Sequence, residues 1–405
     1  MERAILHCDM NNFYASVECM LNPALWDVPV AVCGDVEMRH GIVLAKNYIA
    51  KAYGVETGEA VFLAKQKCKG LVTVPPHFRE YERVSEAARR IYYDYTDLIE
   101  PMGLDECWLD VTGSIRLFGS GEQIAHIIRQ RIKRELGVTI SVGVSFNKVF
   151  AKLGSDMKKP DAVTVIDSAT FKEKIWHLPA TDMIGVGRSS GKVLSRMGVC
   201  TIGDLANMPV GYLKYKLGKA GEIMHRNANG LDTDAVTPRD DMPDKSVGHG
   251  VTAVRDLESN GEVYAMIQEL SEDIGHKLYA SDKAACGVAI SIKNPSFSTI
   301  SRQTNLPVAT QSPSEIARVA YELFLKNYNW DENVRALTVR AINLISAAEP
   351  VQLDIFSCAD SLHKIEKRDL AVEEIRNEFG KGSVFLASTM INYKMPTAEG
   401  PSRIF

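Results

Sequence analysis

Two stretches of sequence decide the fold: AILHCDMNNFY over residues 4–14 and GLDECWLDV over residues 103–111. Each is a short apolar run of the kind that forms a buried strand, and carboxylates interrupt both, Asp9 in the first and Asp105-Glu106 in the second. An ionised carboxylate there costs free energy unless it is paired or holds a cation. Two such strands lying side by side would gather three carboxylates at a point suited to Mg²⁺. Taken alone, an acidic residue in an apolar run more often marks a strand end or a salt bridge.

Length, composition and charge limit the classes of protein to which the chain can belong. The 405 residues are too many for one hydrophobic core and predict about three or four domains. No apolar run reaches the roughly 20 residues that a membrane-spanning helix needs, and the first residues lack a secretory signal. The eight cysteines are scattered without a Cys-x-x-Cys pair, which predicts reduced thiols in a cytoplasmic protein and argues against a zinc site. With a net charge of −4, any grip on nucleic acid must come from local basic patches.

The residues around the acidic strands predict a split βαβ sheet with helices on one face. Apolar spacing predicts helices over 81–95 and 122–136, and a β-branched run predicts a strand over 139–144 with a helix over 146–155 behind it. The segment 20–75 is then an insertion after the first strand. The rest of the chain reads as a helical, glycine-punctuated region over 167–230, an independent α+β unit over 248–347 and a tail over 348–405.

A glycine hairpin at residues 184–189 (IGVGRS), followed by TIGDL at 201–205, indicates a helix-hairpin-helix. The backbone N–H groups of such a hairpin can hold a DNA phosphate without reading sequence. On its own, Gly-x-Gly is more often a plain turn between two helices.

Cations and a phenol elsewhere suit phosphate groups. The stretch NYIAK at 47–51 places Tyr48 and Lys51 on one side of a helix near its start, which fits a polyphosphate but is equally typical of a solvated helix face. Lys148 and the pair Lys158-Lys159 add positive charge near the end of the sheet region.

Together these motifs resemble the Y-family translesion DNA polymerases, and within them the bacterial DNA polymerase IV branch. The motifs occur in the family's order along residues 1 to about 345. They are Asp9 with FYA at 13–15, NY at 47–48, LDECWLD at 104–110, VGVS at 142–145, NKVFAK at 147–152 and KKP at 158–160.

The resemblance implies an α+β, multidomain, right-hand polymerase. Its parts would be a palm over 1–10 and 76–166, fingers over 11–75, a helix-hairpin-helix thumb over 167–233, a linker over 234–247 and an α+β little finger over 248–347. Such an enzyme is a monomer that binds primer–template DNA and dNTPs. It performs error-prone lesion bypass without proofreading.

The resemblance also implies roles for particular residues. Asp9, Asp105 and the main-chain carbonyl of Met10 would ligate two Mg²⁺ ions, with Glu106 completing the site. The triphosphate would be held by the amides of Phe13 and Tyr14 and by Tyr48, Lys51 and Lys159. DNA would be held by Gly185, Gly187, Arg188, Lys148 and Lys152.

The sequence leaves the roles of two of these residues open. Tyr14 would exclude a 2′-hydroxyl as a steric gate, although an aromatic residue packed between fingers and palm would give the same pattern. Lys51 stands where the family usually has arginine, and lysine lacks the bidentate fork on phosphate.

The pentapeptide QLDIF at 352–356 looks like the peptide by which bacterial polymerases bind the sliding clamp. Its glutamine and apolar anchors suit insertion into a preformed hydrophobic pocket. The anchors are Gln352, Leu353, Ile355 and Phe356. The alternative is a strand that packs on its own domain.

Two other classes of protein share parts of this pattern. A nucleotide cyclase uses a similar sheet and paired acids, but it needs neither the hairpin nor the clamp peptide. A non-catalytic DNA-binding relative would be expected to lose metal ligands, yet Asp9, Asp105 and Glu106 are all present.

Overall fold

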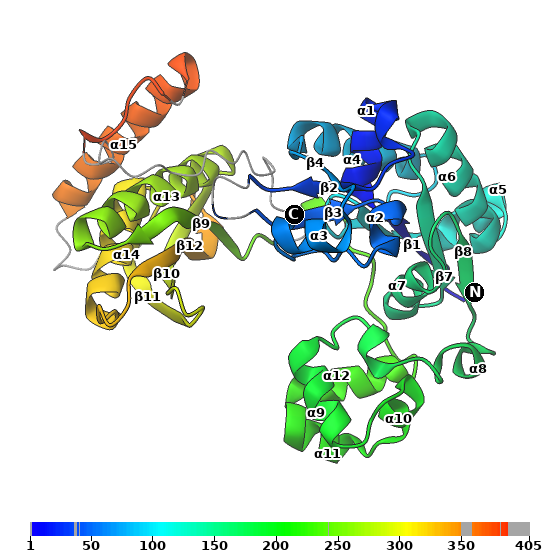
Figure 1. Cartoon of the computed structure of the whole chain (residues 1–405). Helices are drawn as coiled ribbons and strands as arrows, with labels where there is room; N and C mark the ends of the chain where they lie inside the picture. Colours follow the sequence, from blue (N-terminus) through cyan, green and yellow to red (C-terminus); the bar gives the residue numbers. More distant parts are fainter. Residues whose placement is uncertain are drawn as a thin grey trace. The chain divides into compact units, whose positions relative to one another are not determined.

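The computed structural model describes residues 2–35, 39, 41–241, 243–349, 359–380 and 382–387. They form two compact units that divide between residues 242 and 243, each with its own hydrophobic core (Figure 1). The predicted α+β multidomain architecture is confirmed. None of the described helices combines the length and apolar character needed to cross a membrane.

The first unit is built on a five-stranded sheet with the order β5-β6-β1-β7-β8. Its strands are β1 Ile5–Met10, β5 Ile99–Pro101, β6 Glu106–Asp110, β7 Ile140–Ser145 and β8 Val163–Ile166. The helices packed on it are α4 Phe78–Tyr93, α6 Gly121–Leu136 and α7 Lys148–Met157. Because β1 lies antiparallel between β6 and β7, the strands have the split βαβ order expected from the sequence.

Alternation along β1 sorts its side chains between the two faces of the sheet. Leu6 and Met10 join the core formed with α4 and α6. Ile5, His7 and Asp9 alternate with them and face the other side, where Ile5 packs with α7. Helices therefore cover both faces of the sheet, whereas the sequence predicted helices on one face only. The second face is covered because the apolar side of α7 packs against it.

A three-stranded sheet, ordered β3-β2-β4, occupies the predicted insertion. Its strands are β2 Val30–Cys33, β3 Val43–Lys46 and β4 Val72–Val74, and its helices are α1 Phe13–Leu21, α2 Tyr48–Ala52 and α3 Val61–Lys67. Asn47 fixes α2 on this sheet: its side chain accepts from the N–H of Ala50 at 3.0 Å and of Val30 at 3.1 Å, and donates to the carbonyl of Val28 at 2.7 Å. The cap determines where α2 starts.

The helical region has short helices around a core of its own. They are α8 Phe171–Ile175, α9 Arg188–Arg196, α10 Ile202–Asn207, α11 Val210–Leu217 and α12 Lys219–Ala228. A capping box between Thr201 and Asp204 starts α10, which explains the TIGDL sequence at this point.

The first half of the expected linker is fixed on the five-stranded sheet. Val236 is buried with Ile5 and Trp108, and the N–H of Thr237 donates to the carboxylate of Glu100 at 2.8 Å. Val236 and Thr237 are therefore anchored on the sheet, and the role of residues 234–247 as a linker stays a prediction. The stretch is mostly polar, so its sequence does not show that Val236 is buried on the sheet. Nor does it show that the buried carboxylate of Glu100, on strand β5, accepts a hydrogen bond from it.

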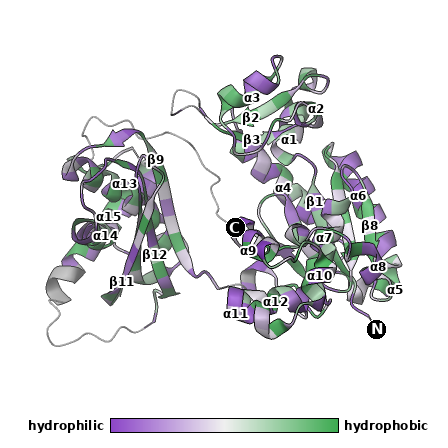
Figure 2. Ribbon diagram, turned by 60° about the horizontal axis from the view of Figure 1, so that its bottom comes forward, coloured by the Kyte–Doolittle hydropathy of each residue, from purple (hydrophilic) through white to green (hydrophobic). Residues whose placement is uncertain are grey.

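The second unit is a four-stranded antiparallel sheet with the order β11-β10-β12-β9. Its elements are β9 Ser246–Leu257, α13 Asn260–Ala280, β10 Lys283–Lys293, β11 Thr299–Thr310, α14 Pro313–Asn327 and β12 Val334–Ser346. Its helices mix hydrophilic and hydrophobic residues along their length, as expected of helices with one side on a sheet (Figure 2).

The described part of the tail includes helix α15 (Ala359–Phe379), which makes polar contacts with the second unit. The carboxylate of Asp369 accepts from the hydroxyl of Ser314 at 3.0 Å, and that of Glu373 pairs with His276 of α13 at 2.5 Å. Arg376 pairs with Glu272, also of α13. The helix is thus held against its own unit.

Candidate active site

Asp9 and Glu106 lie opposite each other where β1 ends and β6 begins. Asp9 is only 4% exposed. A carboxylate oxygen of each residue and a ring nitrogen of His7 lie within 4.8 Å of one another. Asp105 occupies the bend before β6, where its carbonyl accepts a hydrogen bond from the N–H of Met10 at 3.0 Å. The strand pairing therefore brings the acidic residues singled out in the sequence to one edge of the sheet.

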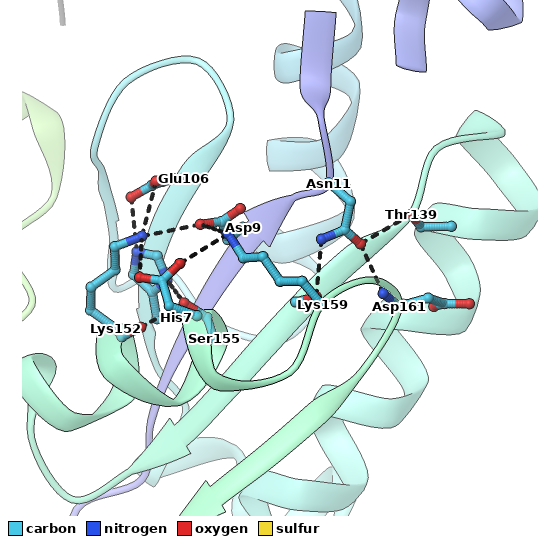
Figure 3. Close-up of polar contacts among 11 residues, drawn as sticks. His7, Asp9, Asn11, Glu106, Thr139, Lys152, Ser155, Lys159 and Asp161 are labelled. Carbon is cyan, nitrogen blue, oxygen red and sulfur yellow. Dashed lines mark hydrogen bonds and ion pairs between the residues drawn. The ribbon is translucent and has the colours of Figure 1, made fainter. Parts of the chain in front are cut away.

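Two lysines face these carboxylates (Figure 3). Nζ of Lys152 lies 3.1 Å from Oδ2 of Asp9 and 3.0 Å from Oε1 of Glu106. Nζ of Lys159 lies 2.8 Å from the same oxygen of Asp9. Both ammonium groups also contact Asp156, at 3.2 and 2.9 Å. From the sequence, Lys152 was predicted to contact DNA, and Asp156 was not predicted to belong to the site. The i,i+4 spacing of Lys152 and Asp156 on α7 could have predicted that these two side chains pair.

Crowding of negative charge changes the pKa values in this cluster. Burial, then the charges of Glu106 and Asp9, raise the pKa of Asp105 to about 6. Burial also opposes ionisation of Glu106, but the ammonium group of Lys152 prevails, and the pKa of this carboxyl is lowered to about 2. Burial lowers the pKa of His7, so the imidazole is neutral at pH 7. The carboxylates therefore depend on the lysines for positive charge.

The donor set fits a divalent cation. The carboxylates of Asp9, Asp105 and Glu106 outnumber the two ammonium groups that face them, and each ammonium group is shared with Asp156. Oε2 of Glu106 and Nε2 of His7 are buried 3.4 Å apart, and neither has a hydrogen-bond partner among the described residues. Carboxylate oxygens with unused lone pairs and excess negative charge are what a hard cation such as Mg²⁺ prefers.

Tyr14 lies in an aromatic cluster beside the acids. Its ring stacks on that of Tyr81 at 4.3 Å between centroids and 12° between planes, and it meets Phe78 edge-on. The hydroxyl of Tyr81 donates to the buried carboxylate of Glu18. Burial and the charge of Asp105 raise the pKa of Tyr14, so the phenol lies within electrostatic reach of the acidic cluster.

The other nucleotide-binding candidates lie on α1 and α2. Phe13 begins α1, and the preceding Asn12 supplies no side-chain cap, so first-turn N–H groups of this helix suit an anion. Burial raises the pKa of Tyr48, and the positive charge of Lys159 opposes this rise with a smaller effect. Nζ of Lys51 lies 5.6 Å from the centre of the Tyr48 ring.

The DNA-binding candidates fall into two groups. Gly185, Gly187 and Arg188 are exposed where α9 begins, and Gly185 has a left-handed φ of 89° that suits glycine. Lys148 instead pairs with Glu100 at 2.6 Å, and Lys152 is occupied by the acids, so a DNA contact through either lysine remains a prediction. The clamp-binding candidates lie outside the described residues. They are Gln352, Leu353, Ile355 and Phe356.

Carboxylates on adjacent strands of a split βαβ sheet, faced by two lysines, are suited to metal-dependent phosphoryl transfer. Family comparison agrees. The impB/mucB/samB family matches residues 8–156, its C-terminal domain matches residues 244–355, and the DNA polymerase-iota thumb domain matches residues 181–232. The chain belongs to the impB/mucB/samB family of Y-family DNA polymerases.

Individual relatives match along nearly the whole chain. DNA polymerase IV of Acetivibrio thermocellus is 54% identical over 95% of this chain and 96% of its own length. DNA polymerase IV of Moorella thermoacetica is 36% identical over 96% of each chain, and DNA polymerase IV 1 of Bacillus subtilis is 34% identical over 96% of this chain and 93% of its own. The solved Y-family DNA polymerase chimera Dbh-Dpo4(243-245)-Dbh has the same fold, with a TM-score of 0.76 at 24% identity, covering 84% of this chain and 99% of that one.

The family resemblance predicted from the sequence is therefore confirmed. The enzyme class is a DNA-directed DNA polymerase of the translesion type. Neither a nucleotide cyclase nor a non-catalytic relative is favoured. Relatives of this kind use divalent metal ions, in agreement with the excess of carboxylates at the site.

Proposed function

We propose that this polymerase adds dNTPs to a primer 3′-end opposite damaged as well as intact template, without proofreading, using two Mg²⁺ ions. The observation that carries the proposal is the register of Asp9 with Glu106, beside Asp105 and opposite Lys159. This register gathers three acidic residues and a lysine at one edge of the sheet, an arrangement suited to metal ions and a triphosphate.

The metal ligands would be Asp9, Asp105 and the main-chain carbonyl of Met10, with Glu106 completing the set. When bound, the ions activate the primer hydroxyl and neutralise the leaving pyrophosphate. Without nucleotide, the two lysines balance the carboxylates. We expect Lys159 to exchange Asp9 for the triphosphate, because its side chain is 26% exposed, whereas that of Lys152 is 14% exposed.

The triphosphate would also meet the first-turn amides of Phe13 and Tyr14 and the side chains of Tyr48 and Lys51. Tyr14 would exclude a 2′-hydroxyl. Its stacking on Tyr81 supports this role, because a gate must resist displacement by the extra oxygen.

The domain roles follow the family pattern. We assign the palm to residues 1–10 and 76–166, the fingers to 11–75, the thumb to 167–233 and the little finger to 248–347. The exposed amides near Gly185 and Gly187 would bind a DNA phosphate. The five-stranded sheet, which carries the acids, supports the palm assignment.

We further propose that residues 352–356 tether the enzyme to a sliding clamp, and that it acts as a monomer in the cytoplasm. The pentapeptide QLDIF supports the first part. The scattered cysteines support the last, and the described ones are free thiols.

Primer extension on an intact and on an abasic template tests this function. We expect Mg²⁺-dependent extension on both, and none by Asp105→Ala, which should still fold and bind primer–template. Asp156→Asn is the matched control, since Asp156 also pairs with both lysines but lies outside the ligand set. Full activity of Asp105→Ala would contradict the assignment.

A further inference from the structure

Asn11 lies directly after β1, two residues beyond Asp9, and is 2% exposed. Its side-chain amide makes three hydrogen bonds (Figure 3). Nδ2 donates to Oγ of Ser141 at 3.0 Å, while Oδ1 accepts from Oγ1 of Thr139 at 3.1 Å and from the backbone N–H of Asp161 at 2.9 Å. Because a backbone N–H can only donate, the last contact fixes which end of the amide faces Asp161.

Asp161 belongs to the loop between α7 and β8 that carries Lys159. Its backbone has a left-handed φ of 54°, so the loop needs external support. From α6, Nη1 of Arg129 contacts the carbonyl of Asp161 at 2.5 Å and its carboxylate at 2.9 Å, and Lys133 contacts the carboxylate at 2.8 Å. The loop is thus fixed by Asn11 as well as by α6.

We infer that Asn11 is a positioning residue that sets the separation of Asp9 and Lys159 before a nucleotide binds. Asn11 is two residues from Asp9, and its partner Asp161 is two residues from Lys159. One hydrogen bond therefore closes a short path between the carboxylate and the ammonium, whose atoms lie 2.8 Å apart. The inference rests on the proposed function, because it assigns Lys159 to the incoming triphosphate.

The expected effect follows from the chemistry of lysine. Its ammonium sits on a flexible four-carbon stem, so the backbone must supply the precision that the side chain lacks. A loosened loop would let Lys159 search a larger volume, and binding would have to restore that order. The loss should appear in nucleotide binding, and the chemical step at Asp9 should be little affected.

The hydrogen-bond pattern distinguishes two substitutions. Asn11→Ala removes all three contacts and leaves the N–H of Asp161 without its partner. Asn11→Asp keeps both accepting contacts, and the hydroxyl of Ser141 can rotate to donate to the carboxylate. Aspartate should therefore rescue what alanine loses.

The test is single-nucleotide insertion by the full chain in Mg²⁺, measured as KM for dNTP and kcat. Asn11→Ala should raise KM about ten-fold with little change in kcat, and Asn11→Asp should stay close to the wild type. Ser141→Ala is the matched control, because it removes one partner of the amide but leaves the contact with Asp161 intact. If Asn11→Ala does not fold, Arg129→Ala loosens the same loop, and the same rise in KM is expected.

A double-mutant cycle with Lys159→Ala shows whether Asn11 acts through this lysine. In the Lys159→Ala background, Asn11→Ala should produce no further rise in KM. An equal rise in both backgrounds, or a fall in kcat with KM unchanged, would overturn the inference. If Lys159→Ala alone leaves KM unchanged, the proposed triphosphate role of Lys159 fails, and the inference fails with it for a distinguishable reason.

Discussion

Replacing Asp105 by asparagine should stabilise the metal-free polymerase while abolishing its activity. Burial and the neighbouring Glu106 and Asp9 raise the pKa of Asp105 from an ordinary 3.8 to about 6. A shift of about two pKa units corresponds to about 3 kcal/mol. Because the pKa is raised in the folded state, the ionised carboxylate destabilises the fold, and asparagine keeps its shape without its charge.

The gain should depend on pH in a defined direction. Below about pH 4 this carboxyl is protonated in both the folded and the unfolded chain, so asparagine gains little. The gain then grows as the pH rises through the folded-state pKa, and it is full above about pH 6. The stability of the wild type relative to Asp105→Asn must therefore fall as the pH rises.

Denaturant unfolding in EDTA at pH 8 and at pH 4.5 measures this gain, followed by the same series in Mg²⁺. Mg²⁺ should stabilise the wild type selectively, because cation binding favours the folded state that holds the ligand set. Asp156→Asn serves as the control and should not stabilise the protein. An Asp105→Asn variant that is no more stable than the wild type at pH 8 in EDTA, or whose gain is the same at both pH values, would contradict this prediction.

Three further outcomes are expected. Lys152→Met deprives Asp9 and Glu106 of their shared partner and should lower the free energy of unfolding by about 2–4 kcal/mol in EDTA. Mg²⁺ should recover part of this loss, and an equal loss in both conditions would contradict the prediction. Tyr14→Ala should raise the ratio of kcat/KM for rNTP to kcat/KM for dNTP by at least about ten-fold, because it removes a steric clash worth at least about 1.4 kcal/mol. An unchanged ratio would mean that Tyr14 serves only in packing. Deletion of residues 352–356 should remove clamp-stimulated synthesis and leave clamp-free synthesis intact, and equal loss of both would favour packing of the peptide on its own unit.

Local sequence was enough to predict the acidic strands and their sheet. Asp9 and Glu106 interrupt short apolar runs, and the order of strands and helices around them permits few topologies. The pairing of β1 with β6 then brings the two carboxylates opposite each other. The family resemblance, carried by several short motifs in a fixed order, named the enzyme class that the comparisons confirm.

Contacts between distant segments could not be predicted in this way. Lys152 was expected at DNA because a lysine on a helix face gives no sign that strand β1 will place Asp9 3.1 Å from it. Within the predicted linker 234–247, nothing local shows that Glu100 will accept the N–H of Thr237. Such assignments need the tertiary structure, since the partners are far apart in sequence and the residues themselves are common surface types.

The most direct test of the account is template-directed insertion by Asp9→Asn. Asp9 contacts both Lys152 and Lys159, and it faces Glu106 across the strand pair. With primed DNA, Mg²⁺ and each dNTP in turn, the wild type should insert mainly the complementary nucleotide. Asp9→Asn should bind the same DNA but insert none, while Asp156→Asn stays active. Insertion by Asp9→Asn at the wild-type rate would contradict the claim that this carboxylate cluster is the catalytic centre.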